Sequence, residues 1–240
     1  MKRTVSDIRL QVVTVVLVVL QLVGIIGLHS GAYGSWFEQI AWVNMLISFV
    51  LVLGMYSRWP GLQVVFAGVA LVVAMVAEII GVQRGWLFGD YHYAGIAGPW
   101  LLGVPLVIGL NWVLLSICTG TLAAALFHHT AARIAAAALL MVGIDILLER
   151  FATAHHLWVW EQGGVPPLMN YVTWAAVAIV LQCLYIALWR DHSNKAAIIY
   201  LIVLSLFLVA DVCFAHTPMH MSAWNYGPPM TIFDHTAGIV

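Results

Sequence analysis

The chain has 240 residues, of which 63% are hydrophobic and only 8% are charged, and its formal net charge is −1. Soluble domains contain about 25% charged residues, so the composition excludes an ordinary soluble protein and indicates an integral membrane protein. The near-zero net charge offers no basic surface for nucleic acid. Cys118, Cys183 and Cys213 lie in apolar segments without C-x-x-C spacing, so neither a disulfide framework nor a zinc knuckle is expected.

In chain order, seven segments are apolar and long enough to cross a bilayer, which takes about 20 residues. The predicted spans are residues 8–28, 37–56, 62–82, 99–119, 131–151, 166–189 and 196–216. The first span lacks a small-residue cleavage pattern, so we interpret it as a membrane helix rather than a signal peptide. We therefore expect an all-α polytopic membrane protein: one integral domain of seven transmembrane helices over residues 1–240, ending in an extracytoplasmic tail at 217–240.

Basic residues predict which side of the membrane each connection faces, because lysine and arginine are enriched in cytoplasmic loops. If the N-terminus is cytoplasmic, only Arg84 and Arg150 lie outside. The basic residues on the inner side are then Lys2, Arg3, Arg9, Arg58, Arg133, Arg190 and Lys195. We therefore predict an N-in/C-out orientation in the cell (inner) membrane, which places the long connections at 84–99 and 155–166 on the extracytoplasmic face.

Several acidic residues fall at a similar depth in the outer half of the predicted bundle. Glu78 and Asp211 lie near the outer ends of their spans, and Asp145 and Glu149 are four residues apart on one helix face. Carboxylates in hydrocarbon are costly, face the bundle interior and are functional candidates. The alternative, which stays open most for Glu149 and Asp211, is ion pairing with one of the two outer arginines or at the membrane interface.

The segments that carry these acids share an order of motifs. Glu78 is followed by FGDYHY and GVPLVIGLNW, and Asp145 is followed by LWVW and GVPPLMNYVTW. Each segment thus has an acid, an aromatic-x-aromatic pair, a Gly-Val-Pro near a helix start and a tryptophan. Proline costs no hydrogen bond at a helix start. An interfacial aromatic belt explains isolated aromatics, but it does not explain the repeated order.

The positions of the histidines and lysines indicate which cofactors the protein could bind. None of the ten histidines lies in the middle of a span, which disfavours haem, and both lysines lie outside the spans, which excludes a retinal Schiff base. Asp211, His216 and His220 could belong to a zinc site of an intramembrane lipid hydrolase. However, Pro218 disfavours a helical ligand pair at the two histidines. We therefore expect no metal and no cofactor, and we keep the zinc hydrolase as an alternative.

A longer pattern includes both segments. Its residues are Glu78, Gly81, Val82, Gly85, Phe88, Gly89, Tyr91, Tyr93, Gly103, Val104, Pro105 and Trp112, then Asp145, Trp160, Val165, Pro167, Asn170, Tyr171 and Trp174. In this pattern the chain resembles the carotenoid hydratase family of archaea and bacteria, whose members are described as bisanhydrobacterioruberin hydratases or γ-carotene hydroxylases. Arg84 and Leu87 stand where the family usually has threonine and proline.

The resemblance implies addition of water to the terminal C=C bond of an acyclic carotenoid, without a cofactor. This chemistry needs an acid in a water-poor pocket, where a carboxyl group favours its neutral form. We expect Glu78 and Asp145 to form the acid–base pair, with Asn170 positioning the water and Glu149 in support. Other candidates for holding the water are Asn111, His92 and a second carboxylate.

Aromatic faces stabilise a carbocation by up to about 2 kcal/mol each when desolvated. The predicted substrate-binding residues are Phe88, Tyr91, Tyr93, Trp112, Trp160 and Trp174. The expected partners are a carotenoid or other isoprenoid lipid and the membrane lipids, with the active site toward the extracytoplasmic half. Two further alternatives remain: a membrane carotenoid or terpene cyclase that uses the same protonation step, and a non-catalytic carrier in which the acids are structural.

Overall fold

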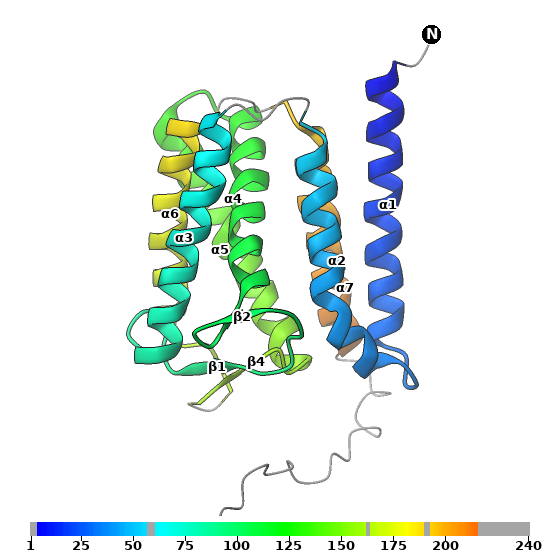
Figure 1. Ribbon diagram of the computed structural model, residues 1–240, viewed down its shortest axis with the longest axis vertical. Coiled ribbons are helices and arrows are strands. Elements are labelled where there is room, and N and C mark those ends of the chain that lie inside the picture. The colour runs from blue at the N-terminus through cyan, green and yellow to red at the C-terminus, as the bar shows by residue number, and fades with distance from the viewer. Residues whose placement is uncertain (1–3, 57–60, 162–163, 190–192, 216–240) are drawn as a thin grey trace, which may run out of the picture.

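The computed structural model describes residues 4–56, 61–161, 164–189 and 193–215. In these residues it contains seven helices long and apolar enough to cross a membrane (Figure 1). The helices are α1 (Val5–Leu28), α2 (Gly34–Gly54), α3 (Gly61–Arg84), α4 (Leu106–Leu126), α5 (Thr130–Ala154), α6 (Leu168–Leu188) and α7 (Lys195–Ala215). The expectation of seven helices long and apolar enough to cross a membrane is therefore confirmed.

Six of the helices begin and end within about three residues of the predicted spans. The fourth was predicted over residues 99–119, but α4 begins at Leu106 and ends at Leu126, so both of its predicted ends were wrong. A two-stranded hairpin precedes the helix, with β2 (Trp100–Leu101) antiparallel to β3 (Val104–Pro105). The turn between the strands places Leu102 at φ 51° and Gly103 at φ 87°, a left-handed conformation that ends any helix there.

Helix α4 is the centre of the bundle and packs against α2, α3, α5, α6 and α7. In Figure 1, α3, α4, α5 and α6 form one group, and α1, α2 and α7 form another beside it. Close approach between α4 and α6 depends on Gly120, because a Cβ atom there would lie 2.5 Å from the Tyr185 ring. Small residues allow such approach between membrane helices.

The two long loops predicted to be functional meet at one end of the bundle, where α1, α3, α5 and α7 end (Figure 1). Strand β1 (Tyr91–Tyr93) from the first loop pairs antiparallel with β4 (Trp158–Trp160) from the second. The two aromatic-x-aromatic motifs are therefore hydrogen-bonded neighbours. The predicted tail at 217–240 lies outside the described residues, and the N-in/C-out orientation stays a prediction.

Candidate active site

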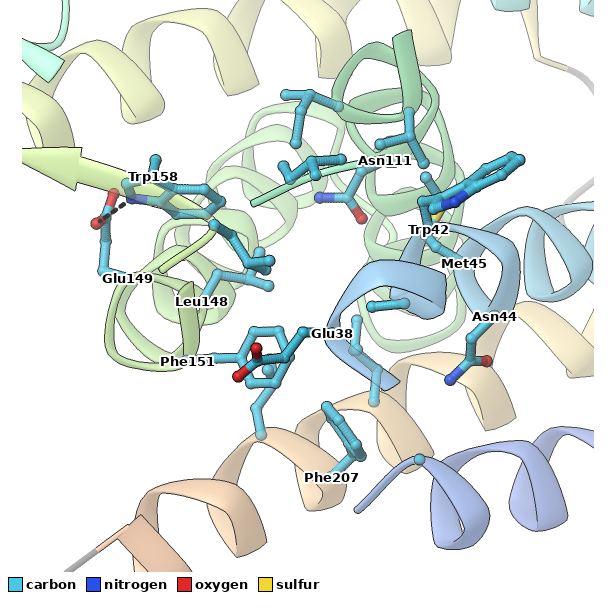
Figure 2. Close-up of a pocket in the computed structure, with 18 of the residues that line it drawn as sticks. Glu38, Trp42, Asn44, Met45, Asn111, Leu148, Glu149, Phe151, Trp158 and Phe207 are labelled. Carbon is cyan, nitrogen blue, oxygen red and sulfur yellow. Dashed lines mark hydrogen bonds between the residues drawn. The ribbon is translucent and has the colours of Figure 1, made fainter. Parts of the chain in front are cut away.

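An apolar cavity of about 290 Å³ lies between the helices. Its wall contains side chains from all seven helices and both long loops, and the carboxyl groups of Glu78, Asp145 and Glu149 contribute to it. Figure 2 shows part of this wall, with Asn111 and Glu149 on opposite sides of the open space. The cavity therefore brings together acids that are up to 71 residues apart in the sequence.

Glu78, in the last turns of α3, accepts three hydrogen bonds. The hydroxyls of Tyr91 and Tyr93 donate to Oε2 at 2.5 and 2.8 Å, and the Trp112 indole N–H donates to Oε1 at 2.8 Å. Burial and the adjacent Glu78 raise the pKa of both tyrosines well above its usual value. Both phenols therefore stay protonated and hold the Glu78 carboxylate in place.

Glu149, on α5, has a matching set of donors. The indole N–H groups of Trp158 and Trp160 donate to Oε2 at 3.0 and 2.9 Å, and the Asn170 amide donates to Oε1 at 3.1 Å. Figure 2 shows the bond from Trp158. Trp158 belongs to the LWVW motif, but sequence reasoning assigned a role only to Trp160. Two residues apart on a strand, the two indoles share a face, and this signal could have identified Trp158.

Asp145 lies one turn before Glu149 and has fewer partners. Asn170 donates from the same amide nitrogen to Asp145 Oδ2 at 3.1 Å. Oδ1 is buried and has no hydrogen-bond partner among the described residues. Asp145 is 1% exposed, so bulk water does not compensate for the missing partner. Asp145 is thus the acid of the cluster with an unpaired oxygen.

The two segments that share an order of motifs also resemble each other in the structure, but the acid that contacts the aromatic pair differs from the one that the spacing indicates. By spacing, Asp145 is the counterpart of Glu78, because each precedes its aromatic pair by 13 residues. By contact, the counterpart is Glu149, because β4 directs its two indoles to the next turn of α5. Spacing alone cannot distinguish residues four apart on a helix, since both lie on the same face.

The predicted aromatic residues surround this cluster. Trp112 and Trp174 stack with ring centroids 3.7 Å apart and an interplanar angle of 20°. Phe88 packs where Gly81 leaves room, because a Cβ atom at Gly81 would lie 2.6 Å from the Phe88 ring. The six aromatic side chains predicted to bind substrate all line the cavity; they are Phe88, Tyr91, Tyr93, Trp112, Trp160 and Trp174.

Among the described residues, no arginine or lysine forms an ion pair with these three carboxylates. Arg84 and Arg150 are exposed, and the Arg84 guanidinium lies 5.5 Å from the centre of the Trp86 ring. His92 also lies outside the cavity and pairs with the exposed Glu161 at 2.7 Å. Neutral hydrogen-bond donors, rather than cations, therefore surround the buried acids.

Asp211 does not join this cluster, although the sequence places it at a similar depth in the predicted bundle. Its Oδ1 lies 2.9 Å from His155 Nε2 and 3.6 Å from His29 Nε2, and His155 Nδ1 lies 3.1 Å from Glu38 Oε1. Sequence reasoning assigned no role to Glu38 or His155, because nothing local marks them. No group of three or more potential metal ligands occurs within the described ranges. His216 and His220, considered above for zinc, lie outside those ranges.

We expect His155 to stabilise the bundle in a pH-dependent way. Burial lowers its pKa, but the hydrogen bonds and charges of Asp211 and Glu38 outweigh this and raise the pKa to about 9 from 6.5. The folded protein therefore holds the proton more tightly than the unfolded chain. The resulting stabilisation is complete below pH 6.5 and is lost as the pH rises through 9.

Thermal unfolding in detergent at several pH values tests this prediction. The unfolding midpoint of His155→Phe should lie below that of the unchanged protein at pH 6.5, and the difference should shrink toward pH 9. His92→Phe is the matched control, since His92 also faces a glutamate but is exposed. A difference for His155→Phe that is constant with pH would contradict the assignment.

The fold and cavity define a class: a polytopic membrane protein with buried carboxyl groups in an apolar chamber. A family model described as "Carotenoid biosynthesis protein" matches residues 40–231. The chain therefore belongs to the carotenoid biosynthesis protein family, which confirms the resemblance seen in the sequence.

A curated relative gives a more specific comparison. The bisanhydrobacterioruberin hydratase of Haloarcula japonica is 30% identical over 190 residues, which cover 68% of this chain and 62% of the relative. The chain thus spans less than two thirds of the length of that relative. No solved structure matches the chain.

Proposed function

We propose that the protein is a cofactor-independent carotenoid hydratase that adds water to the terminal C=C bond of an acyclic carotenoid. The observation that carries the proposal is the set of three buried carboxyl groups in one apolar cavity, one of which has an unpaired oxygen. The name of the Haloarcula japonica relative supports the same reaction class. A membrane-embedded substrate is consistent with an enzyme whose cavity lies between membrane helices.

Asp145 is the proposed proton donor. Glu78 and Glu149 each accept three hydrogen bonds, which favours their ionised forms, whereas Asp145 accepts one. Close carboxyl groups do not all ionise together, so a proton is retained where hydrogen bonding to the anion is weakest. That position is Asp145 Oδ1.

The reaction follows from this arrangement. The Asp145 proton bonds to the less substituted alkene carbon and leaves a tertiary carbocation at the other. The stacked pair of Trp112 and Trp174 and the anionic Glu78 and Glu149 stabilise the cation. The oxygen of a water molecule then bonds to the cation, and the proton released from that water returns to the Asp145 carboxylate. The product is a tertiary alcohol, and the acid is regenerated.

Expression in a host that accumulates an acyclic carotenoid such as lycopene tests the proposal. We expect a pigment whose mass has increased by one water molecule. An unchanged mass with altered chromatographic retention would instead indicate the cyclase, in which a neighbouring C=C bond captures the same cation. Unaltered pigment would contradict both, and stoichiometric zinc in the purified protein would favour the lipid hydrolase.

Asn111 is proposed to hold the attacking water. It lines the cavity, and its amide forms no hydrogen bond among the described residues, whereas the Asn170 amide already serves two carboxylates. In Asn111→Leu we expect hydration to fall by about tenfold, the effect of losing one hydrogen bond. Protonation of the alkene by Asp145 should persist in this variant. In heavy water the acid delivers deuterium, and the cation can lose a proton to give back the alkene. The unreacted carotenoid should therefore still incorporate deuterium.

Asn44→Leu is the matched control, because Asn44 lines another part of the same cavity. It should leave the ratio of hydration to deuterium exchange unchanged. If Asn111→Leu abolishes deuterium exchange together with hydration, Asn111 does not act on the water step. Mass spectrometry of the recovered carotenoid measures both quantities in one experiment.

A further inference from the structure

A second polar cluster reaches the same cavity through one of its members, Glu38. It consists of Glu38 from the first turns of α2, His155 at the end of α5 and Asp211 from α7. Both ring nitrogens of His155 face carboxylate oxygens, Glu38 Oε1 at 3.1 Å and Asp211 Oδ1 at 2.9 Å. With both carboxyl groups ionised, each can only accept, so both ring nitrogens donate and His155 is an imidazolium held between two carboxylates. The raised pKa of His155, about 9, agrees with this state.

The second oxygen of Glu38 has no hydrogen bond within the described part of the chain. The Glu38 side chain is 15% exposed and lines the cavity. Figure 2 shows the Glu38 carboxylate among the side chains that line the cavity. Most of the side chains that line the cavity are apolar, among them Phe37 and Leu157. A carboxylate oxygen in such surroundings lacks the donor that burial normally requires.

This cluster is not needed for the proposed hydration. Asp145 supplies and recovers the proton, and the cation forms beside the indole pair of Trp112 and Trp174. The charge and the surroundings of Glu38 instead indicate which chemical group of a ligand could bind there. Glu38 is the member of the cluster that lines the cavity, and its carboxylate disfavours an anion there. The histidines of the cluster, His155 and the neighbouring His29, contact Asp211 away from the cavity wall. The apolar surroundings of Glu38 disfavour a strongly hydrated cation. A hydroxyl on a hydrocarbon chain satisfies both conditions, because the O–H donates to Glu38 while the chain fills the cavity.

We propose that Glu38, held in place by His155, is a binding subsite for an alcohol hydroxyl carried by an isoprenoid ligand. The subsite rests on the proposed isoprenoid-binding cavity and is independent of the hydration step. Two sources supply such a hydroxyl: the tertiary alcohol formed by the reaction, or a hydroxyl already present on the substrate. The same donor geometry serves either source.

Binding of linalool and myrcene tests the subsite without catalysis. Both are short acyclic terpenes with the same carbon skeleton, and only linalool has a hydroxyl, which is tertiary. Quenching of tryptophan fluorescence in the purified full chain reports binding, because Trp42, Trp112, Trp158, Trp160 and Trp174 line the cavity. The ratio of the two Kd values is compared between variants, so the different partition of the two probes into detergent cancels.

We expect Glu38→Leu to reduce the preference for linalool over myrcene by roughly tenfold or more, which corresponds to losing a hydrogen bond to a charged group. The affinity for myrcene should be retained, which also shows that the cavity still forms. Glu38→Gln keeps an acceptor without the charge and should give an intermediate preference. Glu161→Gln is the control, because Glu161 also pairs with a histidine but lies outside the cavity.

Several outcomes would overturn the proposal. An unchanged preference in Glu38→Leu removes the subsite, and loss of the preference in Asp145→Asn but not in Glu38→Leu assigns the hydroxyl to the acid cluster. If neither probe binds the unchanged protein, the cavity itself is not an isoprenoid site. Equal changes for both probes in Glu38→Leu indicate a structural role for the cluster.

Kinetics then distinguish the two sources of the hydroxyl. If the substrate carries it, Glu38→Leu raises KM for a hydroxylated carotenoid and leaves KM for the hydrocarbon unchanged. If the product carries it, both KM values stay unchanged and inhibition by the tertiary alcohol weakens. If kcat falls for both substrates while the KM values and the inhibition by the tertiary alcohol stay unchanged, a binding role for Glu38 is contradicted.

Discussion

Asp145→Asn should abolish formation of the hydrated carotenoid, with a loss of rate of roughly 10²–10⁴-fold, the usual contribution of a general acid. The amide has nearly the same shape as the carboxyl group but has no acidic proton for the alkene. Deuterium exchange into the carotenoid should be lost together with hydration, because both begin with protonation. Mass spectrometry of the pigment from cells or membranes measures the effect.

The substitution should leave the fold intact. The only hydrogen bond that the Asp145 side chain makes with the described residues is the one from Asn170, and the oxygen of the new amide still accepts it. The change also leaves the charge of the site the same, because the proposed acid form of Asp145 is neutral, as is the amide. We therefore expect the membrane level and thermal unfolding midpoint of Asp145→Asn to match those of the unchanged protein. Retained hydration activity would remove Asp145 from the role of acid.

Glu149→Gln should have the opposite profile, with a large loss of stability. The indoles of Trp158 and Trp160 can only donate, and both donate to Glu149 Oε2. The new glutamine has one oxygen and one NH2 group, and it can take two orientations. If its oxygen accepts from the two indoles, its NH2 group faces the NH2 group of Asn170, and two donors meet. If the side-chain amide is rotated by half a turn, its NH2 group faces both indole N–H groups instead. Each buried donor left unpaired costs about 1–3 kcal/mol. We expect a lower unfolding midpoint and partial loss of hydration.

The matched control for this substitution is Glu161→Gln, which makes the same chemical change at an exposed position. Its unfolding midpoint should be nearly unchanged. The loss of stability in Glu149→Gln should also depend on the two indole donors. In a protein that already carries Trp158→Phe and Trp160→Phe, Glu149→Gln should therefore lower the unfolding midpoint much less. If Glu149→Gln is as stable as the unchanged protein, Glu149 is protonated in the folded state, and the assignment of Asp145 as the acid is wrong.

Much of the architecture could be predicted from the sequence, because hydropathy and span length are local properties of the chain. The one large error, in the position of α4, came from an apolar hairpin. The hairpin contains no charged residue and includes Leu101, Leu102 and Val104, so its composition does not distinguish it from the start of a membrane helix. Backbone conformation at Gly103, rather than hydrophobicity, ends the loop and places Pro105 at the N-cap of α4.

The candidate site could be predicted in part. The doubled order of acid, aromatic pair and tryptophan identified Glu78, Asp145 and the residues around them, since each motif is continuous in the sequence. The sequence did not indicate the division of roles among the acids, because that depends on which donors meet each oxygen. It also did not indicate Glu38 and His155, which are 117 residues apart and carry no local motif.

The sequence by itself determined that the chain has seven segments long and apolar enough to cross a membrane, where six of them lie, and that two similar segments each carry an acid and an aromatic pair. Only the tertiary structure decided that the two aromatic pairs form one small sheet, that Glu149 rather than Asp145 receives the indoles, and that Asp211 belongs to a separate cluster. The physical reason is that hydrophobicity is summed along the chain, whereas helix rotation and strand pairing depend on contacts between distant residues.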